Sequence, residues 1–262
     1  MMKDAVSAPL LPGIKPVLEL LLDAPQRIDL VYCRKGLRSR EAQQIQELCR
    51  ANHLRYSLVE GAALDRLCRG AQTGQSEHVN HQGVVARLAV TEFQPLESVL
   101  AAVHEAPLPL LLALDQVQDP GNLGTLCRSL YALGGAGILL PRHNSAYLGP
   151  AAQRAAAGAL ECLPIARVDN LGHALDSAEE AGLTIYGAGC GGPATVNAFE
   201  EVLRLPAVLV LGNEDKGLRP GVAKRCAHML HIPLARSFDS LNVAQAGAIL
   251  LGLAAARQQR HA

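Results

Sequence analysis

The chain is poor in aromatic residues and has no excess of charge of either sign. It contains no tryptophan, and aromatic residues make up 3% of its 262 residues. Proteins that stack single-stranded nucleic acid on aromatic side chains need more rings than this. Lysine and arginine number 24, as do aspartate and glutamate, so the basic excess typical of nonspecific nucleic-acid binding is missing. Any contact with nucleic acid must therefore be local.

The chain also lacks a metal-binding cysteine pattern and a membrane-spanning segment. Its seven cysteines are widely spaced, without a C-x-x-C pair of the kind that binds zinc or forms a redox dithiol. Such scattered cysteines predict reduced thiols in a cytoplasmic protein. The first residues show no basic stretch followed by an apolar signal core, and the apolar stretch Ala246 to Ala256 is too short to cross a bilayer. We therefore expect neither a membrane nor a metal as partner.

Hydrophobic residues make up 49% of the chain, which is enough for substantial cores. Residues 1–95 show alternating strand and helix patterns that predict a small α/β domain. The expected elements are strands at Ile28 to Cys33, Leu54 to Val59 and Val84 to Val90, and a helix from Ser39 to Asn52 with Ser39 as its N-cap.

A short basic segment follows the first of these strands. Four of its seven residues are basic and none is acidic, namely Arg34, Lys35, Arg38 and Arg40. A local cluster of this kind is a candidate RNA-binding site. A solvated turn that leads into the next helix is the alternative.

Residues 110–262 show apolar runs separated by helical stretches. Runs that are apolar on both faces predict a parallel sheet covered by helices on each side, hence a doubly wound α/β domain. The intervening residues 96–109 are punctuated by proline and predict a linker with a short helix from Glu97 to Glu105. The expected strands are Leu110 to Leu114, Gly137 to Leu140, Leu163 to Val168, Thr184 to Gly187, Ala207 to Leu211 and His228 to Leu234.

The most informative segment runs from Asp115 to Arg128, with the sequence DQVQDPGNLGTLCR. Its proline and glycine force a turn after a buried strand, Asn122 can cap the helix that follows, and Arg128 lies on the second turn of that helix. Backbone donors at a helix start, with a cation nearby, can form an anion or phosphate site. A capped helix with an exposed arginine is the alternative.

Two later segments also carry polar residues at the ends of apolar elements. Leu211 to Leu218 (LGNEDKGL) ends a strand in a turn with two acids and a lysine, at the position where open α/β sheets bind ligands. Ile232 to Val243 (IPLARSFDSLNV) leads into a helix that is apolar on almost every face and must be enclosed. Taken singly, each also fits a polar turn or a helix cap.

A rival pattern lies between these segments. Gly187 to Gly192 fits G-x-G-x-x-G after a strand, and Glu214 lies at a suitable distance for a ribose-binding acid, as in nicotinamide-dependent enzymes. That pattern belongs in the first strand-to-helix turn of its domain, whereas at least three predicted strands of the same domain precede it here. Pro193 also follows it directly.

Together and in this order, the three segments resemble the signature motifs of the SpoU/TrmH family of RNA ribose 2'-O-methyltransferases, in the SPOUT superfamily. His81 to Val84 (HQGV) is similar to the end of the substrate-binding domain in many members. The resemblance implies a deep trefoil knot that encloses Val243 to Ala256, a homodimer, and a front domain with an L30e-like fold. That fold is the one of a small RNA-binding protein of the large ribosomal subunit.

The resemblance further implies S-adenosylmethionine as cofactor and structured RNA, above all ribosomal RNA, as substrate. Arg128 matches the position that activates the ribose hydroxyl. Because a guanidinium rarely gives up its proton, stabilisation of the forming alkoxide or a phosphate contact is the alternative role. The other matching catalytic residues are Asn122, Glu214, Ser240 and Asn242, and the expected cofactor-binding residues are Gly187, Ala188, Leu211, Gly212, Ile232 and Leu241.

Two other functions remain compatible with the sequence. One is methylation of transfer RNA instead of ribosomal RNA. The other is an RNA- or ribosome-binding module of the same fold without catalysis, because the loop Ala235 to Phe238 is bulkier than in many family members and could narrow the cofactor pocket.

Overall fold

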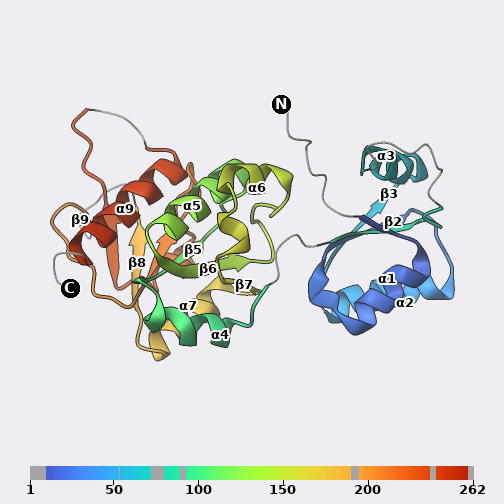
Figure 1. Cartoon of the computed structure of the whole chain (residues 1–262), viewed down its shortest axis with the longest axis horizontal. Helices are drawn as coiled ribbons and strands as arrows, with labels where there is room; N and C mark the ends of the chain where they lie inside the picture. The colour runs from blue at the N-terminus through green and yellow to red at the C-terminus, as the bar shows by residue number, and fades with distance from the viewer. Residues whose placement is uncertain are drawn as a thin grey trace. The chain divides into compact units, whose positions relative to one another are not determined.

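The computed structural model divides the chain into two compact units, Met1–Glu92 and Phe93–Ala262 (Figure 1). Each unit is described by itself. The described residues are 10–52, 54–71, 80–88, 93–189, 195–236 and 240–258.

The first unit is a four-stranded mixed sheet in the order β1-β4-β2-β3. Helices α1 and α2 pack on one face through the core residues Val31 and Cys33, and α3 packs on the opposite face beside Tyr32. The unit consists of β1 (Leu10–Pro12), α1 (Ile14–Asp23), a 3-10 turn (Pro25–Arg27), β2 (Ile28–Arg34), α2 (Arg40–Ala51), β3 (Arg55–Val59), α3 (Gly61–Ala71) and β4 (Val84–Leu88).

The strands and the helix predicted for this unit are confirmed to within a residue or two where they are described. The predicted N-cap is also confirmed, because Ser39 Oγ accepts a hydrogen bond of 3.1 Å from the Ala42 N–H. Strand β1 and helices α1 and α3 were not predicted from the sequence. Part of the reason is that α1 begins after Gly13 without a side-chain cap. Ala89 and Val90, at the end of the last predicted strand, lie outside the described residues.

The second unit is built on a seven-stranded sheet in the order β7-β6-β5-β10-β8-β11-β9, in which neighbouring strands are parallel. The predicted parallel sheet is therefore confirmed. Its strands are β5 (Leu108–Leu114), β6 (Gly135–Pro141), β7 (Ile165–Val168), β8 (Thr184–Ala188), β9 (Thr195–Asn197), β10 (Ala207–Leu211) and β11 (His228–His231).

Two predicted strands were too long, and one strand was missed. The strand expected to reach Leu234 ends at His231, since Pro233 has no N–H to donate to a ladder. The strand expected from Leu163 begins at Ile165, after Pro164. The segment β9 is only three residues long and was not predicted.

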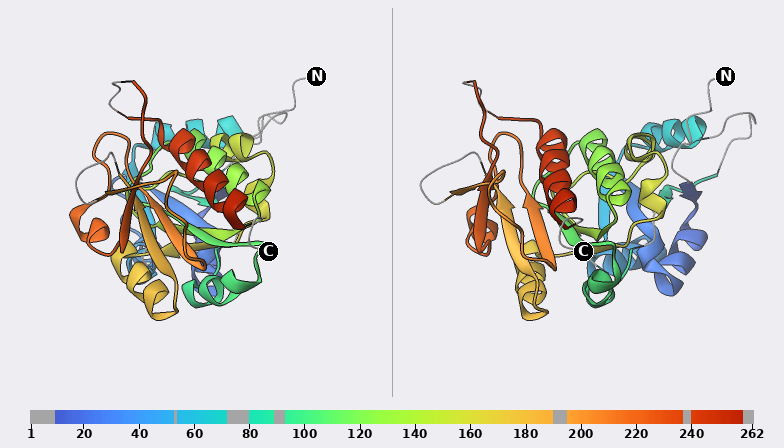
Figure 2. Two further views of the ribbon diagram at one scale, coloured as in Figure 1. Left: turned by 90° about the vertical axis from the view of Figure 1, so that its left-hand side faces the viewer. Right: turned by 60° about the vertical axis from the view of Figure 1, so that its left-hand side comes forward.

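Helices cover both faces of this sheet (Figure 2). One face carries α5 (Pro120–Ala132), α6 (Pro150–Ala156), a 3-10 turn (Ala159–Glu161) and α9 (Val243–Gln258); the other carries α4 (Leu96–Ala101), a 3-10 turn (Ala102–Glu105), α7 (Leu171–Glu180) and α8 (Pro220–Ala223). Strand β5 shows the reason, because Leu110 and Leu112 pack into the first layer while Leu111 and Ala113 pack into the second. Both faces of the strand are thus buried, as its apolar sequence predicted.

The residues expected as a linker contribute to the second unit. Val99, Leu100 and Val103 of α4 and the 3-10 turn after it are buried in the core layer that also contains Leu111. In the part of the chain that the structure describes, no helix is long and apolar enough to span a membrane.

Candidate functional site

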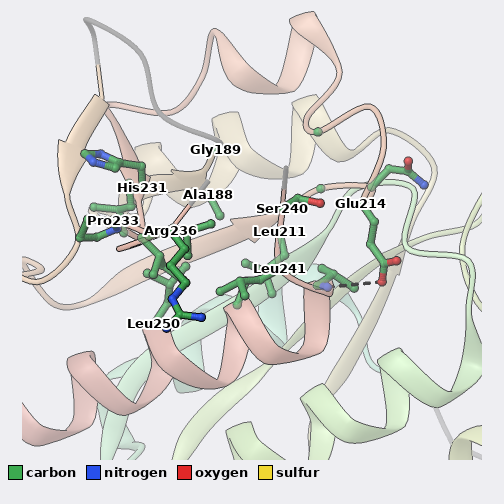
Figure 3. A pocket seen from close by; sticks show the side chains of 18 residues that line it. Ala188, Gly189, Leu211, Glu214, His231, Pro233, Arg236, Ser240, Leu241 and Leu250 are labelled. Carbon is green, nitrogen blue, oxygen red and sulfur yellow. Dashed lines mark hydrogen bonds between the residues drawn. The ribbon is translucent and has the colours of Figure 1, made fainter. Parts of the chain in front are cut away.

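A pocket of about 510 Å³ lies where the carboxyl ends of β8, β10 and β11 meet the start of α9 (Figure 3). Five stretches of chain line it: the end of β8, the loop after β10, the end of β11 with the segment after it, Ser240 with Leu241, and the first turns of α9. Ligands of open parallel sheets bind at this end of the strands. The volume lies within the range of roughly 300–1,000 Å³ that is typical of small-molecule sites.

A polar cluster joins the three sequence motifs at one end of this pocket. Glu214 Oε1 accepts hydrogen bonds from Asn122 Nδ2 at 2.7 Å and from Asn242 Nδ2 at 2.8 Å. It also accepts a longer one, 3.3 Å, from the Val243 N–H. The two amides are linked as well, since Asn242 Nδ2 lies 3.0 Å from Asn122 Oδ1. One carboxylate therefore fastens α5, the loop after β10 and the start of α9 to one another.

The prediction that Asn122 caps α5 is wrong. Asp119 is the N-cap, and its carboxylate accepts the Asn122 N–H at 2.7 Å. With its backbone satisfied in this way, Asn122 can use its side-chain amide for Glu214. At the start of α9, Asn242 does act as a cap, which was the alternative interpretation of that segment, because its Oδ1 accepts from the Ala244 N–H at 2.9 Å.

The loop after β10 is a tight turn that glycine makes possible. Asn213 and Gly217 exchange two backbone hydrogen bonds of 3.1 and 2.9 Å, and Gly217 has a φ of +65°. A Cβ atom at Gly212 would lie 2.5 Å from the Gly217 carbonyl carbon and 2.7 Å from the Leu218 nitrogen. Only a residue without a side chain fits there. The same turn presents Glu214 to the pocket.

Most of the residues expected to bind a cofactor line this pocket. They are Ala188, Leu211, Gly212, Ile232 and Leu241, and Ser240 lines it beside Leu241. Gly187 differs, because it lies within β8 instead of in a turn, and a Cβ atom there would meet Met229 Sδ at 2.6 Å and Cys226 Sγ at 2.8 Å. That position faces packed side chains. Cys190 to Gly192 and the Ser237 to Phe238 part of the bulky loop lie outside the described residues.

Arg128 stands apart from this cluster. It is exposed on α5 and is not among the described residues that line the pocket. Six helical positions separate it from Asn122, which turns the two side chains about 120° away from each other around the helix axis. Asn122, Glu214, Ser240 and Asn242 are therefore gathered within this chain, while Arg128 points elsewhere.

Sequence reasoning missed an ion pair beside the pocket. Asp115, directly after β5, is 0% exposed, and its carboxylate accepts from the Arg219 backbone N–H at 2.8 Å and from Arg219 Nε at 2.7 Å. Burial, followed by the charge of Asp115, raises the pKa of the nearby Cys226 thiol to about 11, so that thiol stays protonated at neutral pH. An acid that ends an apolar strand was the available signal, but the sequence does not show its partner.

The predicted RNA-binding residues belong to the first unit. Arg34, Lys35, Arg38 and Arg40 are all exposed, and Lys35 Nζ lies 3.1 Å from Glu60 Oε1. In the HQG segment of the same unit, His81 Nδ1 accepts the Gly83 N–H at 3.0 Å, which places the ring proton on Nε2, 3.0 Å from Asp65 Oδ1. These contacts hold the turn that enters β4.

The pocket has an apolar lining with a single carboxylate cluster at one end. Backbone groups at the strand ends can bind the polar edges of a flat ligand, while Glu214 places negative charge in the wall and Arg236 adds a cation. Among the described residues no three histidine, cysteine, aspartate or glutamate side chains are grouped to bind a metal ion.

Comparison with known proteins matches both units to family models. Residues 109–252 match the SpoU rRNA methylase family, and residues 10–94 match the RNA 2'-O ribose methyltransferase substrate-binding family. The chain is 31% identical over 241 residues to the 23S rRNA (guanosine-2'-O-)-methyltransferase RlmB of Pseudomonas syringae, covering 91% of this chain and 92% of that protein. It is 35% identical over 242 residues to RlmB of Haemophilus influenzae, covering 91% and 94%.

Solved structures of other methyltransferases have a similar fold. The AdoMet-bound rRNA methyltransferase of Sinorhizobium meliloti aligns with a TM-score of 0.54 and 25% identity, covering 96% of this chain and 87% of that one. The SpoU methyltransferase AviRb of Streptomyces viridochromogenes aligns with a TM-score of 0.57 and 24% identity, covering 96% and 90%.

Proposed function

This chain belongs to the SpoU rRNA methylase family, and we propose that it transfers a methyl group from S-adenosylmethionine to a ribose 2'-hydroxyl of ribosomal RNA. The observation that carries the proposal is the cluster of Asn122, Glu214 and Asn242 at the end of a ligand-sized pocket. It joins residues 120 positions apart in the chain, and each comes from a different family motif.

The pocket fits S-adenosylmethionine. Gly212 lets the turn close tightly beside the pocket, while Leu211, Ile232 and Leu241 offer apolar surface to an adenine ring. The carboxylate of Glu214 favours a ligand that carries a positive charge. When bound, the cofactor supplies a methyl group on a sulfonium, whose thioether is a good leaving group. The protein's remaining tasks are to orient the hydroxyl oxygen in line with that methyl group and to accommodate the developing negative charge.

The polar cluster carries out the orienting task. Glu214 holds the amide of Asn122 in one orientation, and Asn242 fixes it from the other side. A fixed amide can donate to or accept from a ribose hydroxyl without reorganising. Because a guanidinium is a poor general base, the proposed role of Arg128 is to stabilise the forming alkoxide or to bind the adjacent phosphate.

A homodimer would bring an arginine to this cluster, and we include the dimer in the proposal. Arg128 and Tyr131 are exposed on α5, and Tyr131 is 49% exposed despite its large ring. On the neighbouring helix α9, Ile249 is also exposed, and a Cβ atom added at Gly252 would meet nothing within 4 Å. Exposed apolar side chains on two neighbouring helices can pack against a second subunit. Arg128 would then serve the pocket of the partner subunit.

A trefoil knot in the second unit is a further part of the proposal. Strand β10 inserts between β5 and β8, whereas β11 lies on the far side of β8. The chain therefore crosses β8 after β10 and must cross back before α9 packs beside α5. Contacts between Asn242 and Glu214 place the returning segment against the loop after β10. This strand order, with the returning segment against that loop, supports threading of the chain end through the loop.

Three further points complete the proposal. The front unit, which matches the substrate-binding family, holds the RNA through Arg34, Lys35, Arg38 and Arg40. We propose ribosomal RNA as the substrate instead of transfer RNA because the relatives named RlmB are 23S rRNA methyltransferases. A cytoplasmic location accords with the free state of the six described cysteines. The family match leaves the nicotinamide-dependent alternative without support.

The test is a comparison of RNA from cells with and without the gene. We expect one 2'-O-methyl stop in primer extension at low nucleotide concentration to disappear from ribosomal RNA in the deletion strain and to return with the wild-type gene. Loss of a 2'-O-methyl stop from transfer RNA instead would show that transfer RNA is the substrate. Unchanged maps for both RNA classes would favour the inactive RNA-binding module.

A further inference from the structure

Asp115 is a buried carboxylate to which the proposed mechanism assigns no task. It is 0% exposed, and a buried charge of this kind is costly unless it is paired and hydrogen-bonded. Both of its oxygens are paired with a single residue, because Oδ2 accepts the Arg219 N–H at 2.8 Å and Oδ1 accepts Arg219 Nε at 2.7 Å. Arg219 itself has a side chain 43% exposed to solvent, so the carboxylate is the buried partner.

The same residue is also bonded to the other end of the loop after β10. The backbone N–H of Asp115 donates to the Leu211 carbonyl at 2.8 Å. Leu211 is the last residue of β10 and Arg219 directly precedes α8. Asp115 therefore holds both ends of the intervening loop, 212–218. Within this loop, Asn213 Nδ2 also donates a hydrogen bond of 3.3 Å to the carbonyl of Gln116, the residue after Asp115.

The loop closed in this way supplies Gly212, Asn213, Glu214 and Gly217 to the pocket wall. On the other side, the segment that begins at Asp115 leads within five residues to α5 and its Asn122. One buried residue thus sets the separation between the two motifs that meet in the Asn122–Glu214 hydrogen bond.

We propose that Asp115 and Arg219 form a positioning pair that closes the loop 212–218 and thereby holds Glu214 in register with Asn122 and Asn242. This inference rests on the proposed function in so far as the pocket binds S-adenosylmethionine. Neither residue touches the ligand in this account, since neither is among the described residues that line the pocket. Their effect on catalysis is transmitted through the loop.

The variants Asp115→Asn, Arg219→Gln and the double variant test the pair. Asparagine at position 115 can still accept the Arg219 N–H but turns an N–H group toward the guanidinium, where two donors oppose each other. We expect the dissociation constant for S-adenosylmethionine, measured by calorimetry, to rise at least tenfold in each single variant. Because the two groups act as a unit, the dissociation constant of the double variant should not exceed that of the single variant with the larger effect.

The matched control is a second aspartate–arginine pair of the same unit. Arg225 Nε and Nη2 bind the two oxygens of Asp176 at 2.6 and 2.9 Å, between α7 and the end of α8, and neither residue lines the described pocket. We expect Asp176→Asn to lower the melting temperature while the ligand's dissociation constant stays within twofold of wild type. An equal loss of affinity in Asp176→Asn and Asp115→Asn would show that general destabilisation is responsible and would overturn the positioning role.

A second readout does not depend on the ligand. The backbone N–H groups of Asn213 and Gly217 each donate to the other residue's carbonyl across the turn. Hydrogen exchange of these two amides should accelerate at least tenfold in Asp115→Asn and Arg219→Gln and remain unchanged in Asp176→Asn. Unchanged exchange in both Asp115→Asn and Arg219→Gln contradicts the inference even if binding falls. Failure of the wild-type protein to bind S-adenosylmethionine, with exchange accelerated as expected, refutes the proposed function and leaves the loop closure standing. Should Asp115→Asn not fold, Arg219→Gln alone decides, because its side chain is partly exposed.

Discussion

Replacement of Gly212 by alanine tests whether the turn after β10 shapes the cofactor pocket. The added Cβ atom would lie 2.5 Å from the Gly217 carbonyl carbon, 2.6 Å from its oxygen and 2.7 Å from the Leu218 nitrogen. Side chains cannot relieve this overlap, because all three atoms belong to the backbone. The turn itself must move by at least about 0.5 Å before the closest of these contacts reaches 3.0 Å, the lower limit for a real Cβ atom.

Such a movement acts directly on Glu214, which the turn carries. Its hydrogen bond with Asn122 is 2.7 Å long and the one with Asn242 is 2.8 Å. A displacement of this size stretches both toward the upper limit of about 3.2 Å for a good hydrogen bond. A hydrogen bond to a charged group contributes about 1.5–3 kcal/mol, so loss of even one depopulates the binding-competent pocket by tenfold or more. We therefore expect the dissociation constant for S-adenosylmethionine to rise at least tenfold in Gly212→Ala.

Calorimetric titration with S-adenosylmethionine measures this change, and Gly221→Ala provides the control. Gly221 lies in α8 of the same unit, and a Cβ atom there meets nothing within 4 Å. The control should bind the cofactor as the wild-type protein does. Wild-type affinity in Gly212→Ala would refute the reasoning, because it would mean that the turn does not constrain the pocket.

Three other predictions follow from the same structure. Arg128→Ala should lower methyl transfer by at least 100-fold, the scale of a lost charge-stabilising group, with cofactor affinity unchanged in calorimetry; equal activity in a labelled-methyl assay removes Arg128 from the mechanism. Gly247→Ala should destabilise the protein by about 1–2 kcal/mol in urea denaturation, because its Cβ atom would overlap a buried Leu126 methyl group, whereas Gly221→Ala should be neutral or stabilising; similar midpoints for both contradict this packing. Arg38→Gln should weaken RNA binding and reduce the slope of log K against log salt by about 0.7–0.9, and an unchanged slope excludes a phosphate contact.

The sequence was sufficient for the architecture because the signals were local. Long apolar runs such as Leu110 to Leu114 specify strands that are buried on both faces, and this predicted the covered parallel sheet correctly. Ser39 was identified as a helix cap because its hydrogen bond reaches only three residues along the chain. Short or weakly marked elements such as β9 gave no such signal.

The site was predictable only as a set of residues, since its geometry depends on long-range contacts. Family motifs singled out Asn122, Glu214 and Asn242, but the sequence does not tell which amide meets the carboxylate. It also assigned the α5 cap to Asn122, where a competing acceptor at Asp119 takes that role. The pairing of Asp115 with Arg219 joins residues 104 positions apart, and nothing in either local sequence indicates it.

The central claim is that this protein uses the pocket and its polar cluster to methylate a ribose 2'-oxygen. The most direct test is to determine which atom of the RNA receives the methyl group. Purified protein is incubated with ribosomal RNA and methyl-labelled S-adenosylmethionine, and the RNA is then hydrolysed with alkali. Because a 2'-O-methyl group blocks cleavage of the adjacent phosphodiester, we expect the label in an alkali-resistant dinucleotide and its absence with Glu214→Ala. Label recovered in a mononucleotide as a methylated base, or equal labelling by Glu214→Ala, would contradict the account.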